Sequence, residues 1–137
     1  MAYGHVDLID GLQRVKNSFN SYPLDAVAQH AVLASLEDEA WFEASCTKVI
    51  ASRSRLTQGL QTLGFTVLPS SANFVFASPG AEHDARALFL ALRERGIIVR
   101  HFNKPRIADF LRISVGTDEQ CEALLAALSD LMAAGAG

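Results

Sequence analysis

The chain has 137 residues, of which 50% are hydrophobic and 20% are charged, so it is long enough to bury the core of one domain without disulfides. Its formal net charge of -3 gives no electrostatic basis for nucleic acid or an anionic membrane surface as the main partner. We expect no signal peptide and no membrane span, and we interpret the two cysteines as buried reduced thiols of a cytoplasmic protein.

The first third of the sequence predicts three helices. Residues 7–16 place apolar side chains on one face at helical spacing. A second helix is expected from Pro23, which suits a first helical position, to about Glu37. A third, longer helix continues to Leu63, where Gly64 is well placed to end it.

Beyond residue 64, short β-rich runs alternate with amphipathic helices. A helix from about Ala85 to Gly96 separates the second strand from the third, and a last helix follows a capping box made by Thr117 and Gln120. This order predicts an α/β two-layer sandwich, in which the helices pack on one face of a small, mostly antiparallel sheet and further helices precede it. The predicted strands are residues 65–68, 73–77, 97–100 and 111–115.

Arg112 is the strongest candidate for chemistry, because it lies in the middle of the apolar strand 111–115. Alternation sends it to the opposite face from its apolar neighbours, and a charge there requires a partner. Either it forms a salt bridge with Asp109 or Glu119 or is simply exposed, or its planar fork receives a carboxylate or phosphate. Arg100, at the end of the preceding strand, would join it in a phosphate site or would be a solvated rim residue.

Other chemistries find little support. The four histidines are scattered without the spacing of a metal site. The serines lack a neighbouring histidine and aspartate arrangement, and the glycines form no phosphate-binding loop. The sequence therefore indicates neither a metal centre nor a serine hydrolase.

The sequence contains four characteristic blocks, residues 15–25, 68–76, 96–102 and 111–117. They resemble the histidinol-phosphate aminotransferases, a branch of the fold-type I pyridoxal-phosphate enzymes. These blocks occur in the family's order, with similar gaps, over nearly the whole chain. The resemblance implies an aminotransferase small domain and a part in histidine biosynthesis, where an amino group passes between histidinol phosphate and glutamate.

The resemblance also implies roles for individual residues. Arg112 would hold the anionic end of each small-molecule substrate, the phosphate of one and the carboxylate of the other. Arg100 would be the second arginine, which favours the phosphate. Asn73 and Tyr22 lie in motifs near the family's active site without an assigned role.

One departure from the family is that its Schiff-base lysine lies upstream of the matched blocks, and Lys16, Lys48 and Lys104 fall in none of its lysine motifs. We therefore expect this chain alone to bind no pyridoxal phosphate and to be inactive, although the full-length family uses that cofactor. Residues 1–37 would be a helical remnant that packs on a large domain, and residues 38–137 the small C-terminal domain.

The N-terminal helices would then expose apolar side chains, and we expect a homo-oligomer formed through them. Two other functions stay open: a non-catalytic interaction module, and part of a related pyridoxal-phosphate enzyme such as a threonine-phosphate decarboxylase. The apolar side chains expected to be exposed are Leu8, Ile9, Leu12, Phe19, Val27 and Trp41.

Overall fold

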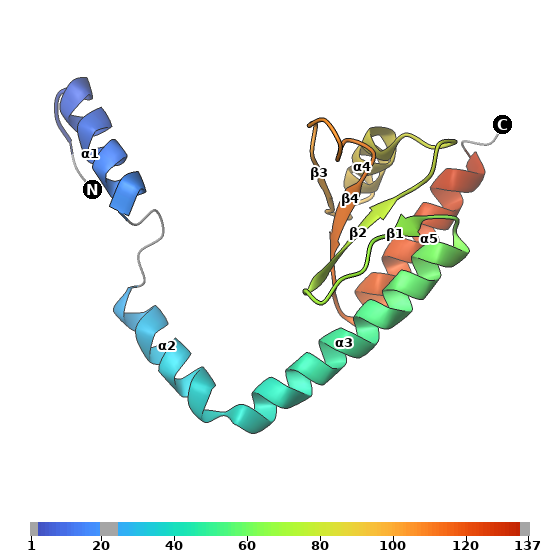
Figure 1. Ribbon diagram of the computed structural model, residues 1–137, viewed down its shortest axis with the longest axis horizontal. Coiled ribbons are helices and arrows are strands. Elements are labelled where there is room, and N and C mark those ends of the chain that lie inside the picture. The colour runs from blue at the N-terminus through green and yellow to red at the C-terminus, as the bar shows by residue number, and fades with distance from the viewer. Residues whose placement is uncertain (1–2, 20–24, 135–137) are drawn as a thin grey trace. The chain divides into compact units, whose positions relative to one another are not determined.

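The computed structural model describes residues 3–19 and 25–134, which form five helices and one four-stranded sheet (Figure 1). The chain divides into two compact units, Met1–Phe42 and Glu43–Gly137. The first unit holds the N-terminal helices, and the second holds the sheet and the helices that cover it. None of the helices within the described ranges is long and apolar enough to span a bilayer.

The first unit contains α1 (Val6–Phe19) and α2 (Ala26–Glu37). Asp25 caps α2, because its side chain accepts a hydrogen bond of 2.8 Å from the backbone N–H of Ala28. The helix therefore begins at Ala26, later than the expected start at Pro23, which itself lies outside the described residues. The expected end near Glu37 is confirmed, and α2 has no buried residue.

Three helices belong to the sheet unit, and local signals set their ends. The φ angles of Gly64 and Gly96 are +88° and +77°, a left-handed conformation that stops the helix before each glycine. Asp84 caps the middle helix by accepting from the backbone N–H of Arg86 at 2.7 Å. The helices are α3 (Glu39–Thr62, which begins in the first unit), α4 (Ala85–Glu94) and α5 (Asp118–Ala134).

The four strands form a sheet in the order β1-β2-β4-β3, and every neighbouring pair is antiparallel. The predicted order of strands and helices is confirmed, as is the small antiparallel sheet. The predicted strand 97–100 is largely wrong, because only Arg100 of that run is in a strand. The N–H of Ile97 instead donates to the carbonyl of Leu92 at 2.9 Å and closes the end of α4. The strands are β1 (Thr66–Val67), β2 (Phe74–Ser78), β3 (Arg100–His101) and β4 (Leu111–Ser114).

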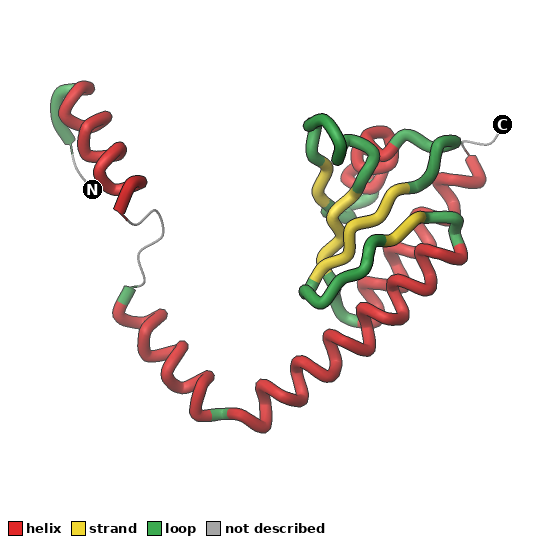
Figure 2. The backbone as a smooth tube through the Cα atoms, viewed as in Figure 1, coloured by secondary structure: helices red, strands yellow, loops and turns green. Residues whose placement is uncertain are grey.

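The hydrophobic core lies between one face of the sheet and α3, α4 and α5; Figure 2 shows the strands and the helices of this unit. Alternate strand residues such as Val75 and Ile113 point into this core, where they meet Leu60 of α3 and Leu128 of α5. The helices therefore cover one face, as the sequence predicts. Cys121 is also in the core, but Cys46 is only half-buried, because it precedes the part of α3 that packs on the sheet.

Candidate functional site

The candidate site lies on the face of the sheet that α3, α4 and α5 do not cover. Phe74 and Phe76 of β2 and Arg112 of β4 are half-buried on this face. The strand register pairs Phe76 with Arg112 and pairs Arg112 with Arg100 of β3. Because directly paired residues of antiparallel strands share a face, the fold brings the two predicted arginines next to each other.

The guanidinium of Arg112 packs against aromatic rings. Its Cζ lies 5.6 Å from the ring centroid of Phe74 and 5.8 Å from that of Phe102. It forms no ion pair or hydrogen bond with any residue in the described ranges, so the salt bridge to Asp109 or Glu119 that we considered is not formed. The N–H groups of the guanidinium, which lie in its plane, are therefore available to hydrogen-bond another acceptor.

Glu119, one of the two carboxylates considered for Arg112, is engaged at the start of α5. Its pKa is lowered from the ordinary value of 4.5, first by a hydrogen bond from its own backbone N–H and then by one from Thr117. This carboxylate is thus stabilised by the helix start rather than by the arginines of the sheet.

Arg100 is exposed and shares an aromatic neighbour with Arg112. Its Cζ lies 5.3 Å from the ring centroid of Phe102. Like Arg112, it forms no ion pair with a described residue. Two guanidiniums without carboxylate partners therefore adjoin one ring, which makes this face attractive to an anion.

A cavity of ≈ 440 Å³ lies beside Arg112, and the loop between β1 and β2 forms its other wall. This loop is held in place, because Ser70 Oγ donates to the carbonyl of Phe74 at 2.6 Å and Arg53 of α3 donates to the carbonyl of Ala72 at 2.7 Å. The lining residues are Leu68, Pro69, Ser70, Ser71, Ala72, Phe74, Phe76 and Arg112.

Of the two remaining predicted site residues, only Asn73 lies within the described ranges. Asn73 is exposed and is not among the lining residues, and its backbone carbonyl accepts a 2.9 Å hydrogen bond from the N–H of Val115. It serves the pairing of β2 with β4. Tyr22 lies outside the described residues.

Sequence reasoning missed the aromatic side chains around the arginines. The Phe76 ring stacks on Phe110 with centroids 4.8 Å apart, and it lies 6.4 Å from the ring of Phe102. A partial signal was present, because Phe74 and Phe76 alternate within one strand and Phe102 follows Arg100 by two residues. The contacts themselves join segments far apart in the sequence, so spacing alone could not reveal them.

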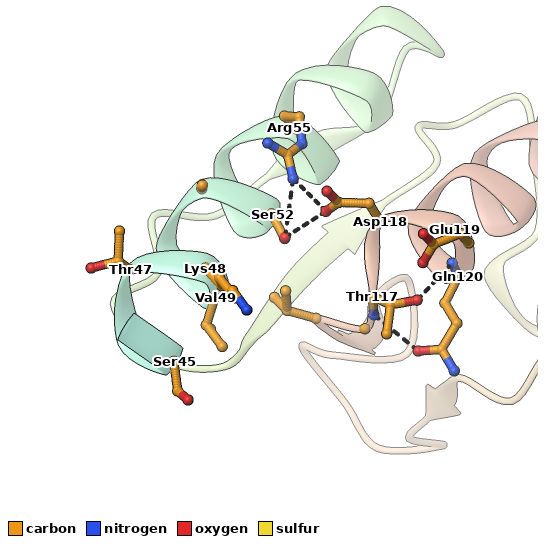
Figure 3. A pocket seen from close by; sticks show the side chains of 13 residues that line it. Ser45, Thr47, Lys48, Val49, Ser52, Arg55, Thr117, Asp118, Glu119 and Gln120 are labelled. Carbon is orange, nitrogen blue, oxygen red and sulfur yellow. Dashed lines mark hydrogen bonds and ion pairs between the residues drawn. The ribbon is translucent and has the colours of Figure 1, made fainter. Parts of the chain in front are cut away.

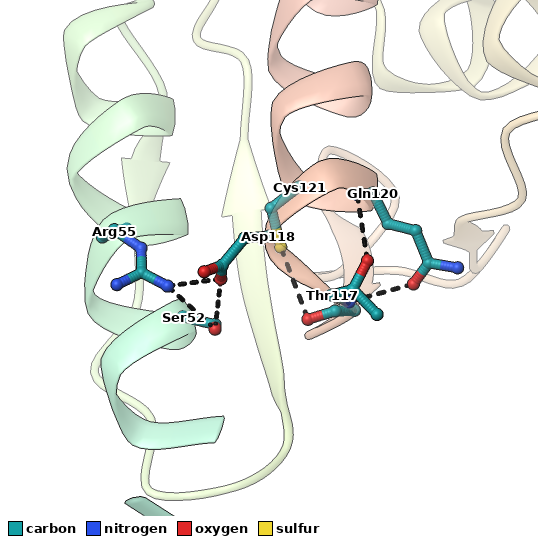
Figure 4. A network of polar contacts seen from close by, with 7 residues as sticks. Ser52, Arg55, Thr117, Asp118, Gln120 and Cys121 are labelled. Carbon is teal, nitrogen blue, oxygen red and sulfur yellow. Dashed lines mark hydrogen bonds and ion pairs between the residues drawn. The ribbon is translucent and has the colours of Figure 1, made fainter. Parts of the chain in front are cut away.

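A second hollow, of ≈ 840 Å³, lies between α3 and the start of α5 (Figure 3). The Ser52 hydroxyl donates to Asp118 at 2.7 Å, and Arg55 donates to both of these residues (Figure 4). These bonds, with that of Ser52 the larger cause, lower the pKa of Asp118 from its ordinary value of 3.8. The predicted capping box is confirmed: Thr117 N–H donates to Gln120 Oε1 at 3.0 Å, and Gln120 N–H donates to Thr117 Oγ1 at 3.3 Å. The hydrogen bonds among Ser52, Arg55 and Asp118 join α3 to the start of α5, and those between Thr117 and Gln120 cap α5.

Comparison with known proteins gives the family. The family model for aminotransferase class I and II matches residues 1–128. The chain belongs to this family. Histidinol-phosphate aminotransferase 2 of Burkholderia mallei is 59% identical over 133 residues, and histidinol-phosphate aminotransferase 2 of Thiobacillus denitrificans is 60% identical over 131 residues. These alignments cover 97% and 95% of this chain, but the chain spans only 37% and 36% of the length of those relatives.

The solved structures agree with the sequence relatives. The structure of histidinol-phosphate aminotransferase from Sinorhizobium meliloti in complex with pyridoxal-5'-phosphate has a TM-score of 0.76 and is 27% identical. The similarity covers 89% of this chain and 34% of that chain. The resemblance to histidinol-phosphate aminotransferases and the fold-type I architecture are therefore confirmed.

The family depends on pyridoxal phosphate, but the described residues do not fit that cofactor. A Schiff-base lysine must face an enclosed site, whereas Lys16, Lys48 and Lys104 are all exposed. None of the three lines the cavity beside Arg112. Within residues 3–19 and 25–134, no group of histidines, cysteines and carboxylates could hold a metal ion either. The arginine face can bind an anion, and we derive no cofactor step from these residues.

Proposed function

We propose that this chain is the C-terminal, substrate-anion-binding part of a histidinol-phosphate aminotransferase of histidine biosynthesis. The observation that carries this proposal is that Arg112 and Arg100 lie side by side on one sheet face with no carboxylate partner among the described residues. The names of the relatives, at 59% and 60% identity, support the choice of reaction.

The arginines would act by binding and orienting substrate. The fork of Arg112 can donate two parallel hydrogen bonds to the phosphate of histidinol phosphate or to the carboxylate of glutamate. A phosphate monoester carries almost a second negative charge at neutral pH, so Arg100 would add more to phosphate binding than to carboxylate binding. The partly apolar wall made by Phe74 and the loop 68–72 would strengthen these interactions by excluding water.

The anion site can be tested by titrating the chain with inorganic phosphate and following the arginine Nε–H resonances by NMR. Arg112→Gln should abolish the response, because each charge-assisted hydrogen bond is worth about 1.5–3 kcal/mol, or roughly tenfold or more in affinity. Arg100→Gln should weaken phosphate binding more than acetate binding. The matched control is Arg93→Gln, which removes an exposed arginine of α4 away from this face. Equal phosphate binding by the wild type and Arg112→Gln would contradict the proposal.

We also propose that this chain by itself neither holds pyridoxal phosphate productively nor transfers amino groups, and that it works in the cytoplasm. The cofactor would be held by parts of the full enzyme other than the described residues. The test is to mix the chain with pyridoxal phosphate and glutamate and to measure the visible absorption of the cofactor and the formation of 2-oxoglutarate. A band shift beyond that given by pyridoxal phosphate and glutamate alone, or amino transfer faster than in that protein-free mixture, would overturn this part of the proposal.

The proposal extends to the domains: residues 1–37 pack on the large domain of the full enzyme, and residues 38–137 form the small domain. Support comes from exposed apolar side chains, since Leu8 is 67% exposed and Val27 78%, and Trp41, just beyond this segment, is 64% exposed. Leu12 is also exposed, Ile9 is half-buried, and the side chain of Phe19 lies outside the described residues.

Without the large domain, two copies of this chain would cover these side chains by associating through the N-terminal helices. Light scattering at high protein concentration should show a dimer or larger species. Leu8→Ser with Val27→Ser should shift the chain toward the monomer, whereas Leu90→Ser, which changes an exposed leucine of α4, should not. A monomeric wild-type chain would count against this association.

A further inference from the structure

The ring of Phe102 is the point at which the two arginines of the sheet face meet. The Cζ atoms of Arg100 and Arg112 lie 5.3 Å and 5.8 Å from its centroid, and Arg112 also adjoins Phe74 at 5.6 Å. Arg100 and Arg112 are direct partners in the β3–β4 register. One aromatic side chain therefore contacts both members of a cross-strand pair of like charges.

Such a pair is unfavourable unless something offsets the repulsion. A carboxylate would offset it, but it would also occupy the N–H donors that an incoming anion needs. The face of an aromatic ring attracts a guanidinium through its quadrupole and accepts none of its in-plane hydrogen bonds. Phe102 can thus hold both guanidiniums near each other and leave their donors available.

The ring of Phe102 is itself held by its surroundings. It lies 6.4 Å from the ring of Phe76. The loop that follows Phe102 closes on itself, because Lys104 N–H donates to the Phe102 carbonyl at 2.9 Å and His101 Nε2 lies 2.7 Å from the Ala108 carbonyl oxygen. The position of the ring is therefore set by the sheet unit rather than by a ligand.

We propose that Phe102 is a positioning residue that couples Arg100 and Arg112 into one receptor for a dianionic phosphate monoester, so that it sets the preference for phosphate over carboxylate. This inference rests on the proposed function, since it assumes that Arg112 binds the anionic end of the substrate. It adds to that function a specificity role for a side chain that makes no hydrogen bond to the anion.

The experiment compares Phe102→Leu with Phe110→Leu in the 137-residue chain. Both changes remove a half-buried aromatic ring of the same sheet face, but only Phe102 contacts the arginines. The probes are inorganic phosphate and acetate, and the readouts are the dissociation constants and the arginine Nε–H resonances. Phe102→Leu should weaken phosphate binding roughly fivefold, the combined effect expected for two exposed cation–π contacts, and should change acetate binding less.

A conservative variant separates positioning from packing. Phe102→Tyr keeps the ring and should restore phosphate binding to near the wild-type value, and Phe110→Leu should leave it close to wild type. Equal losses in Phe102→Leu and Phe110→Leu, or no rescue by tyrosine, would overturn the role of Phe102. If phosphate binding depends on Arg112 but not on Phe102, the positioning role fails while the proposed function stands. If the wild type does not bind phosphate through Arg112, both fail.

Discussion

Replacing Arg112 by methionine should separate the stability of the sheet from its ability to bind anions. The guanidinium is half-buried, it has no ion pair with a described residue, and it is paired across strands with Arg100. A positive charge at this position therefore contributes little to the free energy of unfolding. We therefore expect Arg112→Met to change the free energy of unfolding little while it removes phosphate binding.

The contacts of Arg112 give the size of the expected change. The substitution loses cation–π contacts with Phe74 and Phe102, worth about 0.5–1 kcal/mol each. It relieves the repulsion from Arg100, about 0.2–1 kcal/mol, and it adds sulfur–aromatic contacts of about 0.3–1.5 kcal/mol each. At the middle of each range, with one sulfur contact to each ring, these contributions cancel to within about 1 kcal/mol. An arginine that neutralised a buried carboxylate would instead cost about 3–5 kcal/mol to remove.

The assay is urea unfolding followed by far-UV circular dichroism, with linear extrapolation to zero denaturant. The control is Arg53→Met, because Arg53 is also half-buried but donates to the Ala72 carbonyl at 2.7 Å. The control should lose about 1–3 kcal/mol, since it removes the partner of a part-buried carbonyl. If Arg112→Met lost more than about 2 kcal/mol, or as much as the control, Arg112 would be a structural arginine and the reasoning would be refuted.

Three further outcomes follow from the helices and the core. The pKa of Asp118 is lowered from 3.8 in the folded chain, so its stabilising effect is present above that value and is lost as the pH falls through the lowered pKa. Asp118→Asn should therefore be less stable than the wild type above about pH 5 and approach it in acid; a pH-independent difference in urea unfolding would contradict this. Thr117→Ala should cost about 1 kcal/mol and lower the melting temperature, whereas Thr117→Ser should not; equal melting temperatures for all three chains would argue against the cap. Leu60, which is 0% exposed, should cost about 2–5 kcal/mol when changed to alanine, and Leu90, which is 48% exposed, should cost far less in the same unfolding assay.

Features that depend on neighbouring residues could be predicted from the sequence. The ends of α3 and α4 follow from glycines at positions 64 and 96, because only glycine adopts their positive φ angles without strain. The start of α5 follows from Thr117 and Gln120, whose reciprocal hydrogen bonds span three residues. Alternation within 111–115 correctly sent Arg112 to the face opposite Ile113.

The predictions from sequence were wrong at two places where contacts in the fold differ from those that the local pattern indicates. Residues 97–99 have strand-forming side chains, but the N–H of Ile97 closes α4 by bonding to Leu92. Cys46 lies in a predicted helix, but it precedes the stretch of α3 that packs on the sheet. The first outcome depended on a local hydrogen bond at the end of α4, and the second on which part of α3 reaches the sheet.

The amino-acid sequence by itself determined the order of elements, the ends of α3 and α4, the start of α5 and the face of β4 on which Arg112 lies, because these depend on periodicity and on contacts a few residues apart. Only the tertiary structure decided the environment of that arginine. The β3–β4 register sets Arg100 against Arg112, and the fold brings Phe74 of β2 and Phe102, which follows β3, to the same guanidinium. A register shift of one residue would turn an arginine toward the opposite face, so strand pairing decides whether the site exists.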